Sequence, residues 1–260
     1  MNQEEILCYW DTYIYEQQEN YRDDVDLLLQ WLGDKPQRVF EVACGGGRIL
    51  VPLAKAGHQA DGIDADPYML ARLALLAEGL PNISWRQGDA TAGDWGEDYD
   101  AIVLGGNILI NILSDMPTMD AQRLFLQKAA SCVKAGGHMY LDFNCPPIAN
   151  IPWQEQKEWL CFDGTDDHGT YGKYFVCGDT TDGVSRNIVG HGRFEITPKD
   201  GETFVVEVAT PNHFPTIPQV RGWLKEFGWE IEIIYGNRQG GPVDESEEKG
   251  VSAIIWARKA

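Results

Sequence analysis

The sequence RVFEVACGGGR, residues 38–48, joins a short apolar run to three adjacent glycines. The segment that follows, up to Gly57, has its apolar residues at helical spacing. This order predicts a buried strand, a glycine turn and a helix. Glycine has no Cβ, so a ligand can approach the turn closely, and the helix start offers N–H groups to it. The stretch therefore predicts a binding site for a nucleotide-like ligand.

The same alternation continues along the chain. Short apolar runs that predict strands lie at 38–43, 58–64, 83–89, 99–106 and 138–143. Helical spacing separates them, most clearly at 67–79 and 119–133. Five short strands alternating with helices predict an α/β fold with a doubly wound parallel sheet.

The segments before and after this alternating region show other sequence patterns. Residues 4–32 carry helical spacing and end at Gly33, which suits a helix end. Residues 171–214 hold β-rich runs separated by Asp182-Gly183 and Asp200-Gly201, dipeptides that favour tight hairpin turns. A helix at 217–228 and strands at 229–236 and 251–259 complete the alternation. We predict an antiparallel β insert within one domain.

Two acids stand where predicted strands end. Asp64 closes the second strand and Asp89 follows the third. Ligands bind at the carboxyl edge of a doubly wound sheet, where a carboxylate can accept hydrogen bonds from both hydroxyls of a ribose. The dinucleotide fingerprint is incomplete because position 50 is Leu, and no GK[ST] follows the glycines. Asp64 suits an adenosyl ribose, and Asp89 suits the adenine amine.

Composition narrows the range of partners. The 21 Lys and Arg and 40 Asp and Glu give a net charge of −19, which repels nucleic acid and anionic lipid. The six cysteines include no CxxC pair and the five histidines share no ligand spacing, so we expect no metal site. The start lacks the features of an export signal, and no stretch is apolar enough to span a membrane. The cytoplasm is the expected compartment.

Together these motifs resemble those of class I S-adenosylmethionine-dependent methyltransferases, in particular the small-molecule N-methyltransferases that act on glycine, sarcosine and amino sugars. The resemblance rests on YWDTYIYEQQENY (9–21), EVACGGGR (41–48), GIDADPYML (62–70), QGDA (87–90), YDAIVLGGN (99–107), VKAGGHMYLDF (133–143) and FGWEIEIIYG (227–236). It implies a seven-stranded Rossmann-like sheet whose last strand is antiparallel, with the β insert between the fifth strand and the last helix. The expected parts are an N-terminal helical cap (1–35), a cofactor-binding core (36–150), the insert as a substrate lid (151–215) and the closing helix and strands (216–260).

The resemblance also assigns residues. Glu41, Gly45 and Gly47 would frame the methionine part of the cofactor, Asp64 its ribose, and Asp89 with Ala90 its adenine. The full set of candidate cofactor-binding residues is Glu41, Ala43, Gly45, Gly46, Gly47, Arg48, Asp64, Ala65, Asp89, Ala90, Gly105 and Asn107. The expected cofactor is S-adenosyl-L-methionine, and its product is S-adenosyl-L-homocysteine.

Methyl transfer is an in-line displacement from an activated donor, so the protein chiefly aligns the acceptor and excludes water. The candidate residues for this step are Tyr9, Tyr21, Asn111 and His213. Amino-sugar relatives often have a His near position 111, and the Asn found here cannot act as a general base at neutral pH. An amine acceptor would therefore arrive neutral or lose its proton elsewhere.

The sequence leaves the acceptor open. A small molecule methylated at an amine nitrogen is the main hypothesis, and an oxygen, sulfur or peptide acceptor is the first alternative. The second is a non-catalytic protein that binds the cofactor and regulates a partner. A homodimer is one assembly to test.

Overall fold

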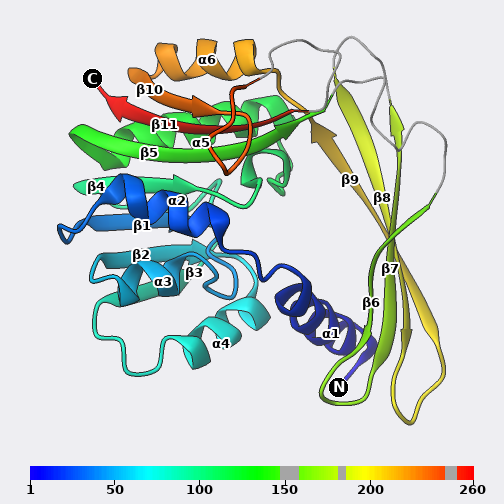
Figure 1. Cartoon of the computed structure of the whole chain (residues 1–260). Helices are drawn as coiled ribbons and strands as arrows, with labels where there is room; N and C mark the ends of the chain where they lie inside the picture. The colour runs from blue at the N-terminus through cyan, green and yellow to red at the C-terminus, as the bar shows by residue number, and fades with distance from the viewer. Residues whose placement is uncertain (147–157, 181–185, 244–250) are drawn as a thin grey trace. The chain divides into compact units, whose positions relative to one another are not determined.

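The computed structural model describes residues 1–146, 158–180, 186–243 and 251–260. The chain divides into two compact units, which Figure 1 draws together. The core unit comprises Arg22–Pro147 and Phe214–Ala260, and the insert unit comprises Met1–Tyr21 and Ile148–His213. Within the described residues, no helix has both the length and the hydrophobicity needed to cross a lipid bilayer.

The core unit is built on one seven-stranded sheet, seen face-on in Figure 1 with its strands one above the other. Its strands are β1 (Arg38–Val42), β2 (Gln59–Asp64), β3 (Ile83–Gln87), β4 (Tyr99–Leu104), β5 (Val133–Cys145), β10 (Trp229–Tyr235) and β11 (Val251–Lys259). They lie in the order β10-β11-β5-β4-β1-β2-β3, and β11 runs antiparallel to both of its neighbours. This confirms the predicted Rossmann-like sheet with an antiparallel last strand.

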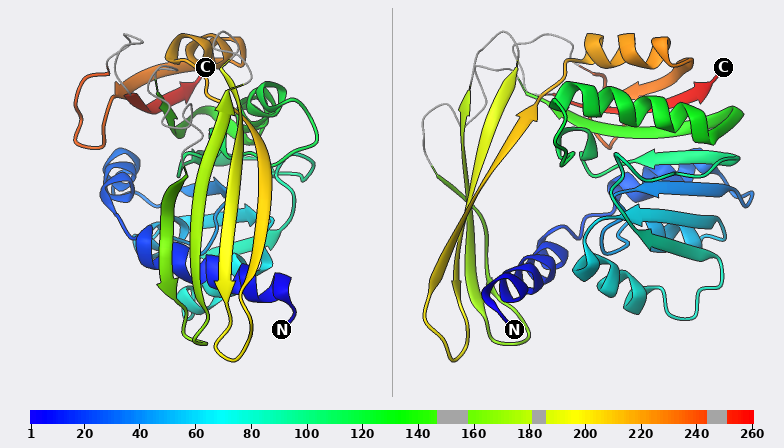
Figure 2. Two further views of the ribbon diagram at one scale, coloured as in Figure 1. Left: turned by 90° about the vertical axis from the view of Figure 1, so that its right-hand side faces the viewer. Right: turned by 180° about the vertical axis from the view of Figure 1, so that it is seen from behind.

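Helices cover both faces of this sheet, as the rear view in Figure 2 shows. They are α2 (Asp23–Leu32), α3 (Leu50–Lys55), α4 (Pro67–Leu76), α5 (Thr118–Cys132) and α6 (Ile217–Glu226). Adjacent residues of β4 point to opposite faces: Ile102 packs in the cluster that contains Phe125 of α5, and Val103 packs with Leu50 of α3. Since both faces are buried, the central strands are continuous apolar runs, which is why the sequence revealed them.

The described residues of the insert unit form one helix and a four-stranded antiparallel sheet. The helix is α1 (Gln3–Gln18), and the strands, in sheet order, are β6 (Trp159–Thr165), β7 (Tyr171–Thr180), β8 (Asn187–Thr197) and β9 (Phe204–His213). Trp10 of α1 is fully buried against Phe194 and Ile196, and its indole N–H donates to the Gly164 carbonyl at 3.0 Å. The insert after β5 is confirmed.

Several details differ from the sequence-based expectation. The helical stretch 4–32 is two helices, α1 in the insert unit and α2 in the core unit. Strand β6 was not predicted, and β5 begins at Val133 rather than near residue 138. The turn at Asp200-Gly201 lies between β8 and β9 as expected. The predicted turn at Asp182-Gly183 and the polar loop Asp244–Lys249 lie outside the described residues.

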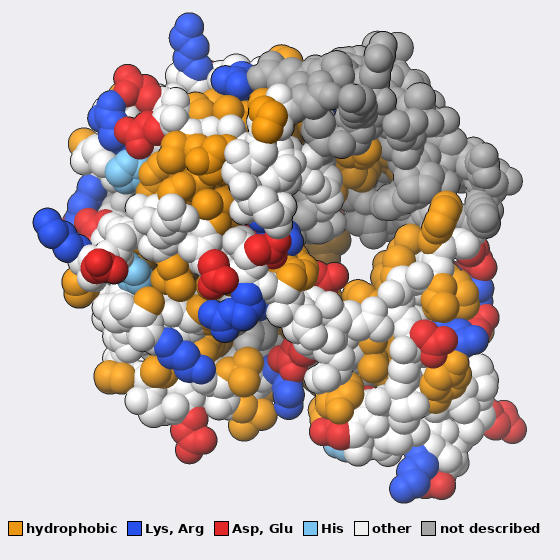
Figure 3. Space-filling model, viewed as in Figure 1, with side chains coloured by type: hydrophobic (Ala, Val, Ile, Leu, Met, Phe, Trp, Pro, Cys, Tyr) orange, Lys and Arg blue, Asp and Glu red, His pale blue; other side chains and the backbone are white. Residues whose placement is uncertain are grey.

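Charged side chains on the face drawn in Figure 3 are dispersed. Lys and Arg stand singly or beside Asp and Glu over the described part of this face, and they form no continuous basic track. A track of that kind is the usual footprint of nucleic-acid binding.

Candidate functional site

The glycine turn is tied directly to the end of β2. The Gly45 N–H donates to Asp64 Oδ2 at 2.8 Å, and the Asp66 N–H donates to Asp64 Oδ1 at 2.8 Å. The Cys44 N–H also donates to the Ile63 carbonyl at 3.1 Å. One carboxylate therefore fixes the turn after β1 and the chain leaving β2. The two features that the sequence predicted separately form one structural unit.

The outer two glycines of the turn meet different requirements. Both have positive φ, +50° at Gly45 and +88° at Gly47, and Ala43 before them has φ 56°. A Cβ on Gly47 would lie 2.4 Å from Leu73 Cδ1 and 2.9 Å from Val51 Cγ2, so packing within the fold requires glycine there. A Cβ on Gly45 would meet nothing within 4 Å. Gly45 thus faces open space, where a ligand can approach the backbone.

Glu41, near the end of β1, is a buried carboxyl group with an unsatisfied oxygen. Its side chain is 4% exposed, and Oε2 has no hydrogen-bond partner in the part of the chain that the structure describes. Burial raises the pKa of Glu41 well above its ordinary value, and the Arg48 guanidinium only partly opposes this. A buried polar atom without a partner is costly to maintain, so it points to a ligand group that completes it.

The end of β3 lies beside the end of β2. The Gly88 N–H donates to the Asp64 carbonyl at 2.8 Å, and the Gln87 side chain donates to the Ala65 carbonyl at 3.2 Å. Asp89 is exposed and accepts from the Thr91 N–H at 2.7 Å; hydrogen bonds from Thr91 lower the pKa of Asp89. Asp64, the last residue of β2, and Asp89, two residues after β3, thus lie at the carboxyl ends of neighbouring parallel strands.

Comparison with known proteins assigns a family to the part of the chain that contains these residues. Residues 39–137 match the model of a family described as "Methyltransferase domain". These residues form a class I S-adenosylmethionine-dependent methyltransferase domain. S-adenosylmethionine is the methyl donor of that family, so the predicted cofactor and enzyme class are confirmed for the domain.

The curated relatives match part of the chain. A ubiquinone biosynthesis O-methyltransferase of Chelativorans sp. (strain BNC1) is 32% identical over 107 residues, which are 40% of this chain and 39% of that protein. The 23S rRNA (uracil(1939)-C(5))-methyltransferase RlmD of Shewanella sp. (strain ANA-3) is 37% identical over 67 residues, 25% of this chain and 15% of that one. The chain thus matches well under half the length of either relative.

Solved structures share the whole fold at low identity. A methyltransferase from Clostridium acetobutylicum ATCC 824 superposes with a TM-score of 0.73 at 14% identity, covering 96% of this chain and 98% of that one. The sugar N-methyltransferase KedS8 from Streptoalloteichus sp ATCC 53650 gives 0.71 at 14% identity, with 96% and 93% covered. At this identity the likeness establishes the fold alone.

A buried ion pair joins the glycine turn of the methyltransferase domain to α2. Arg48 donates through both terminal nitrogens to Asp24, at 2.8 Å to Oδ1 and 2.7 Å to Oδ2. Asp24 is 1% exposed. The sequence predicted Arg48 as a cofactor residue but missed Asp24, because nothing local connects two residues 24 positions apart. We infer that Arg48 positions the turn through Asp24.

This inference predicts non-additive substitutions. Arg48→Lys keeps the positive charge but loses the bidentate contact with Asp24. We therefore expect about threefold weaker binding of S-adenosylhomocysteine. In an Asp24→Asn background, the same Arg48→Lys change should have little further effect, because its partner is already altered. Calorimetric titration of the four proteins tests this, with Asp26→Asn, at an exposed acid of the same helix, as the control. Equal weakening in both backgrounds would instead indicate direct contact between Arg48 and the ligand.

Hydrogen bonds hold the loop after β4 against β5. Asn107 adopts a left-handed conformation, with φ 63°. Its N–H donates to Asp142 Oδ1 at 2.7 Å, and its side-chain oxygen accepts from the Asn144 N–H at 2.8 Å. Gly105, the first residue of the loop, packs against Ile49. Asn111 follows the short helix η1 (Ile108–Ile110) with an exposed side chain.

The other three candidate catalytic residues belong to the insert unit. Tyr9 donates its hydroxyl to Asp167 Oδ1 at 2.7 Å and stacks on the ring of His168, with centroids 4.1 Å apart. Tyr21 is half-buried at the end of the N-terminal part of this unit. His213 ends β9 fully buried; burial, with a contribution from the Arg186 charge, lowers its pKa to about 4, so its imidazole is neutral at pH 7. Their catalytic roles stay predictions.

Proposed function

We propose that this protein transfers a methyl group from S-adenosylmethionine to an amine nitrogen of a small molecule. The observation that carries the proposal is the carboxylate of Asp64, which joins the glycine turn to the β2 end in a methyltransferase domain. The residues fit the cofactor. Gly45 faces open space, and Oε2 of Glu41 lacks a partner among the described residues.

Each of these residues has a part in holding the cofactor. Asp64 would accept hydrogen bonds from the ribose hydroxyls, since each of its oxygens keeps a lone pair beyond the backbone N–H it already accepts. Glu41 would accept from the ammonium group of the methionine part, and Asp89 from the adenine amine. The bound cofactor supplies a methyl group activated by a positively charged sulfur. The chain then has only to align the acceptor and keep water out.

Two observations support an amine acceptor. Solved structures that share this fold include an amino pentose methyltransferase, a sugar N-methyltransferase and a glycopeptide N-methyltransferase. The net charge of −19 favours cationic over anionic small molecules. Asn111 supplies no base, so an amine acceptor must arrive neutral or lose its proton elsewhere before it reacts. Its lone pair forms the C–N bond as the C–S bond breaks, and the extra proton leaves the product nitrogen for solvent.

A radiolabel experiment tests the proposal. With tritiated S-adenosylmethionine and pools of amines, thiols, phenols and peptides, we expect label in the amine pool. Label only in the phenol pool would favour an oxygen acceptor, the class named for the Chelativorans relative. A parallel titration should show binding of S-adenosylhomocysteine and none of NAD. Binding without transfer to any pool, together with a stoichiometric protein complex, would favour a regulatory role instead.

A further inference from the structure

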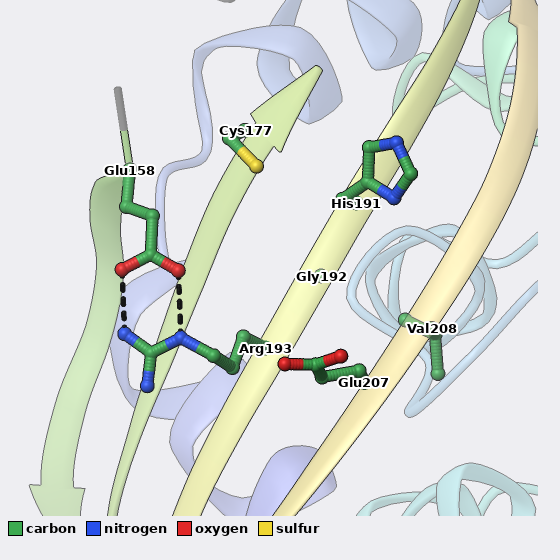
Figure 4. A pocket seen from close by; sticks show the side chains of 7 residues that line it. All are labelled: Glu158, Cys177, His191, Gly192, Arg193, Glu207 and Val208. Carbon is green, nitrogen blue, oxygen red and sulfur yellow. Dashed lines mark hydrogen bonds and ion pairs between the residues drawn. The ribbon is translucent and has the colours of Figure 1, made fainter. Parts of the chain in front are cut away.

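The insert unit contains a cavity of ≈ 140 Å³ that no part of the methyl-transfer proposal uses. Figure 4 shows the side chains around it, which come from β7, β8, β9 and the residue before β6. The lining residues are Glu158, Cys177, His191, Gly192, Arg193, Glu207 and Val208. The volume is enough for several groups of the size of a water molecule.

The strand register brings the polar residues of the cavity together. Cys177 is paired with His191 across β7 and β8, and Arg193 is paired with Glu207 across β8 and β9. Side chains at paired and at alternate positions share one face of a sheet, so these four lie on the same face. Phe194, on the opposite face of β8, packs in the α1 cluster. The polar face is therefore not part of the hydrophobic core of the insert.

The one guanidinium in the cavity is already occupied by carboxylates. Arg193 donates through Nε and one terminal nitrogen to the two oxygens of Glu158, both at 2.6 Å, as the dashed lines in Figure 4 show. Its other terminal nitrogen donates to Glu195. The same guanidinium lies 4.4 Å from the ring centre of Phe175. Arg193 is thus poorly placed to bind an anionic ligand.

Glu207 then gives the cavity an excess of negative charge. Within the described residues its carboxylate has no hydrogen bond or ion pair, and in Figure 4 it extends toward β8. In the cavity lining, the two carboxylates of Glu158 and Glu207 therefore outnumber the single guanidinium of Arg193. Glu207 is exposed, so a positively charged N–H donor can reach it from solvent and pair with its carboxylate, with the His191 imidazole as a further polar neighbour. We propose that this cavity binds the ammonium group of a small organic amine.

The proposal goes beyond methyl transfer and does not depend on it, and it can be tested with one simple probe. In an NMR titration of the full chain at pH 7, ethanolamine should produce saturable shifts of the backbone amides of residues 191–193 and 207–208. Ethane-1,2-diol, of the same size but uncharged, and acetate should not. Because the contact is electrostatic and partly exposed, raising the salt concentration should weaken it.

A matched pair of variants locates the site. Glu207→Gln removes one negative charge from the cavity and should weaken ethanolamine binding about tenfold, the effect of losing one charge-assisted hydrogen bond. Glu202→Gln removes the same charge from the exposed turn between β8 and β9 and should leave binding unchanged. The proposal is overturned if ethanolamine produces no saturable shift, if the diol binds equally well, or if Glu207→Gln binds like the unmodified chain. S-adenosylhomocysteine binding, measured separately, reports on the methyl-transfer proposal alone.

Discussion

Replacing Asp64 by alanine is expected to weaken the binding of S-adenosylhomocysteine about 10- to 150-fold, the range for loss of charge-assisted hydrogen bonds. Two effects act in the same direction. The variant loses the proposed acceptor for the ribose hydroxyls. It also loses the contacts to the Gly45 and Asp66 N–H groups, at 2.8 Å each, that hold the turn against the β2 end. Calorimetric titration of the variant measures the change.

Two further variants make this result interpretable. Asp64→Asn keeps the shape of the side chain, but its amide NH₂ cannot accept from a backbone N–H, so it should bind more weakly than Asp and more tightly than Ala. Asp66→Asn lies two residues away and keeps an effective N-cap on α4, so its affinity should be unchanged. A folded Asp64→Ala protein that binds the ligand within twofold of the unmodified chain would contradict the ribose assignment.

The core unit was largely predictable because its signals are local. Strands such as β4 are buried on both faces, and the helices between them carry regular apolar spacing, so each element appears in the sequence by itself. Strand β6 gave no such signal. Most of its side chains are exposed, it contains the turn-like Asp163-Gly164, and only pairing with β7 makes it a strand. The early start of β5 includes Gly136 at φ +77°, a residue that usually interrupts strands.

Part of the candidate site could also be predicted from the sequence, and part of it could not. Asp64 and the glycines could be placed together because parallel strands bring their carboxyl ends to one edge. Asp24 could not be singled out, since it is one of three acids in the first turn of α2, where acids are common for helix-dipole reasons. Only the packing of α2 on the sheet buries Asp24 against Arg48. Long-range pairing of this kind leaves no local pattern.

Glu41→Gln should stabilise the protein while weakening its ligand binding. The folded chain keeps Glu41 buried near the acids Asp64 and Asp24, and Arg48 is its compensating cation. Removing a buried charge with an unsatisfied oxygen should raise the free energy of unfolding by about 1–3 kcal/mol near pH 8. A variant that gains stability at a site while losing function there indicates that the original residue is held in an unfavourable state for binding.

The pH dependence of this effect has a definite sign. Burial raises the pKa of Glu41 in the folded chain above the ordinary value of 4.5, so between these two values the folded state binds more protons than the unfolded state. The free energy of unfolding therefore falls as pH rises through this window. Gln has no such proton, so the variant and the unmodified chain should be equally stable below the ordinary pKa and diverge above it. Urea unfolding at a series of pH values measures the divergence.

The affinity for the ligand should rise with pH, whereas the stability falls. This difference tests whether the unsatisfied oxygen of Glu41 binds the cofactor. Glu41 must lose its proton to accept from the ammonium group of the methionine part, so the affinity of the unmodified chain should rise with pH through the raised pKa. In Glu41→Gln the contribution of residue 41 is lost, and binding near pH 8 should be about tenfold weaker. Titration in two buffers of different ionisation enthalpy would detect the released proton directly.

Glu78→Gln, an exposed charge change in the same unit, is the control for this experiment. It should retain both the proton release and the affinity. Proton release that persists in Glu41→Gln would assign it to another group and remove Glu41 from the binding site.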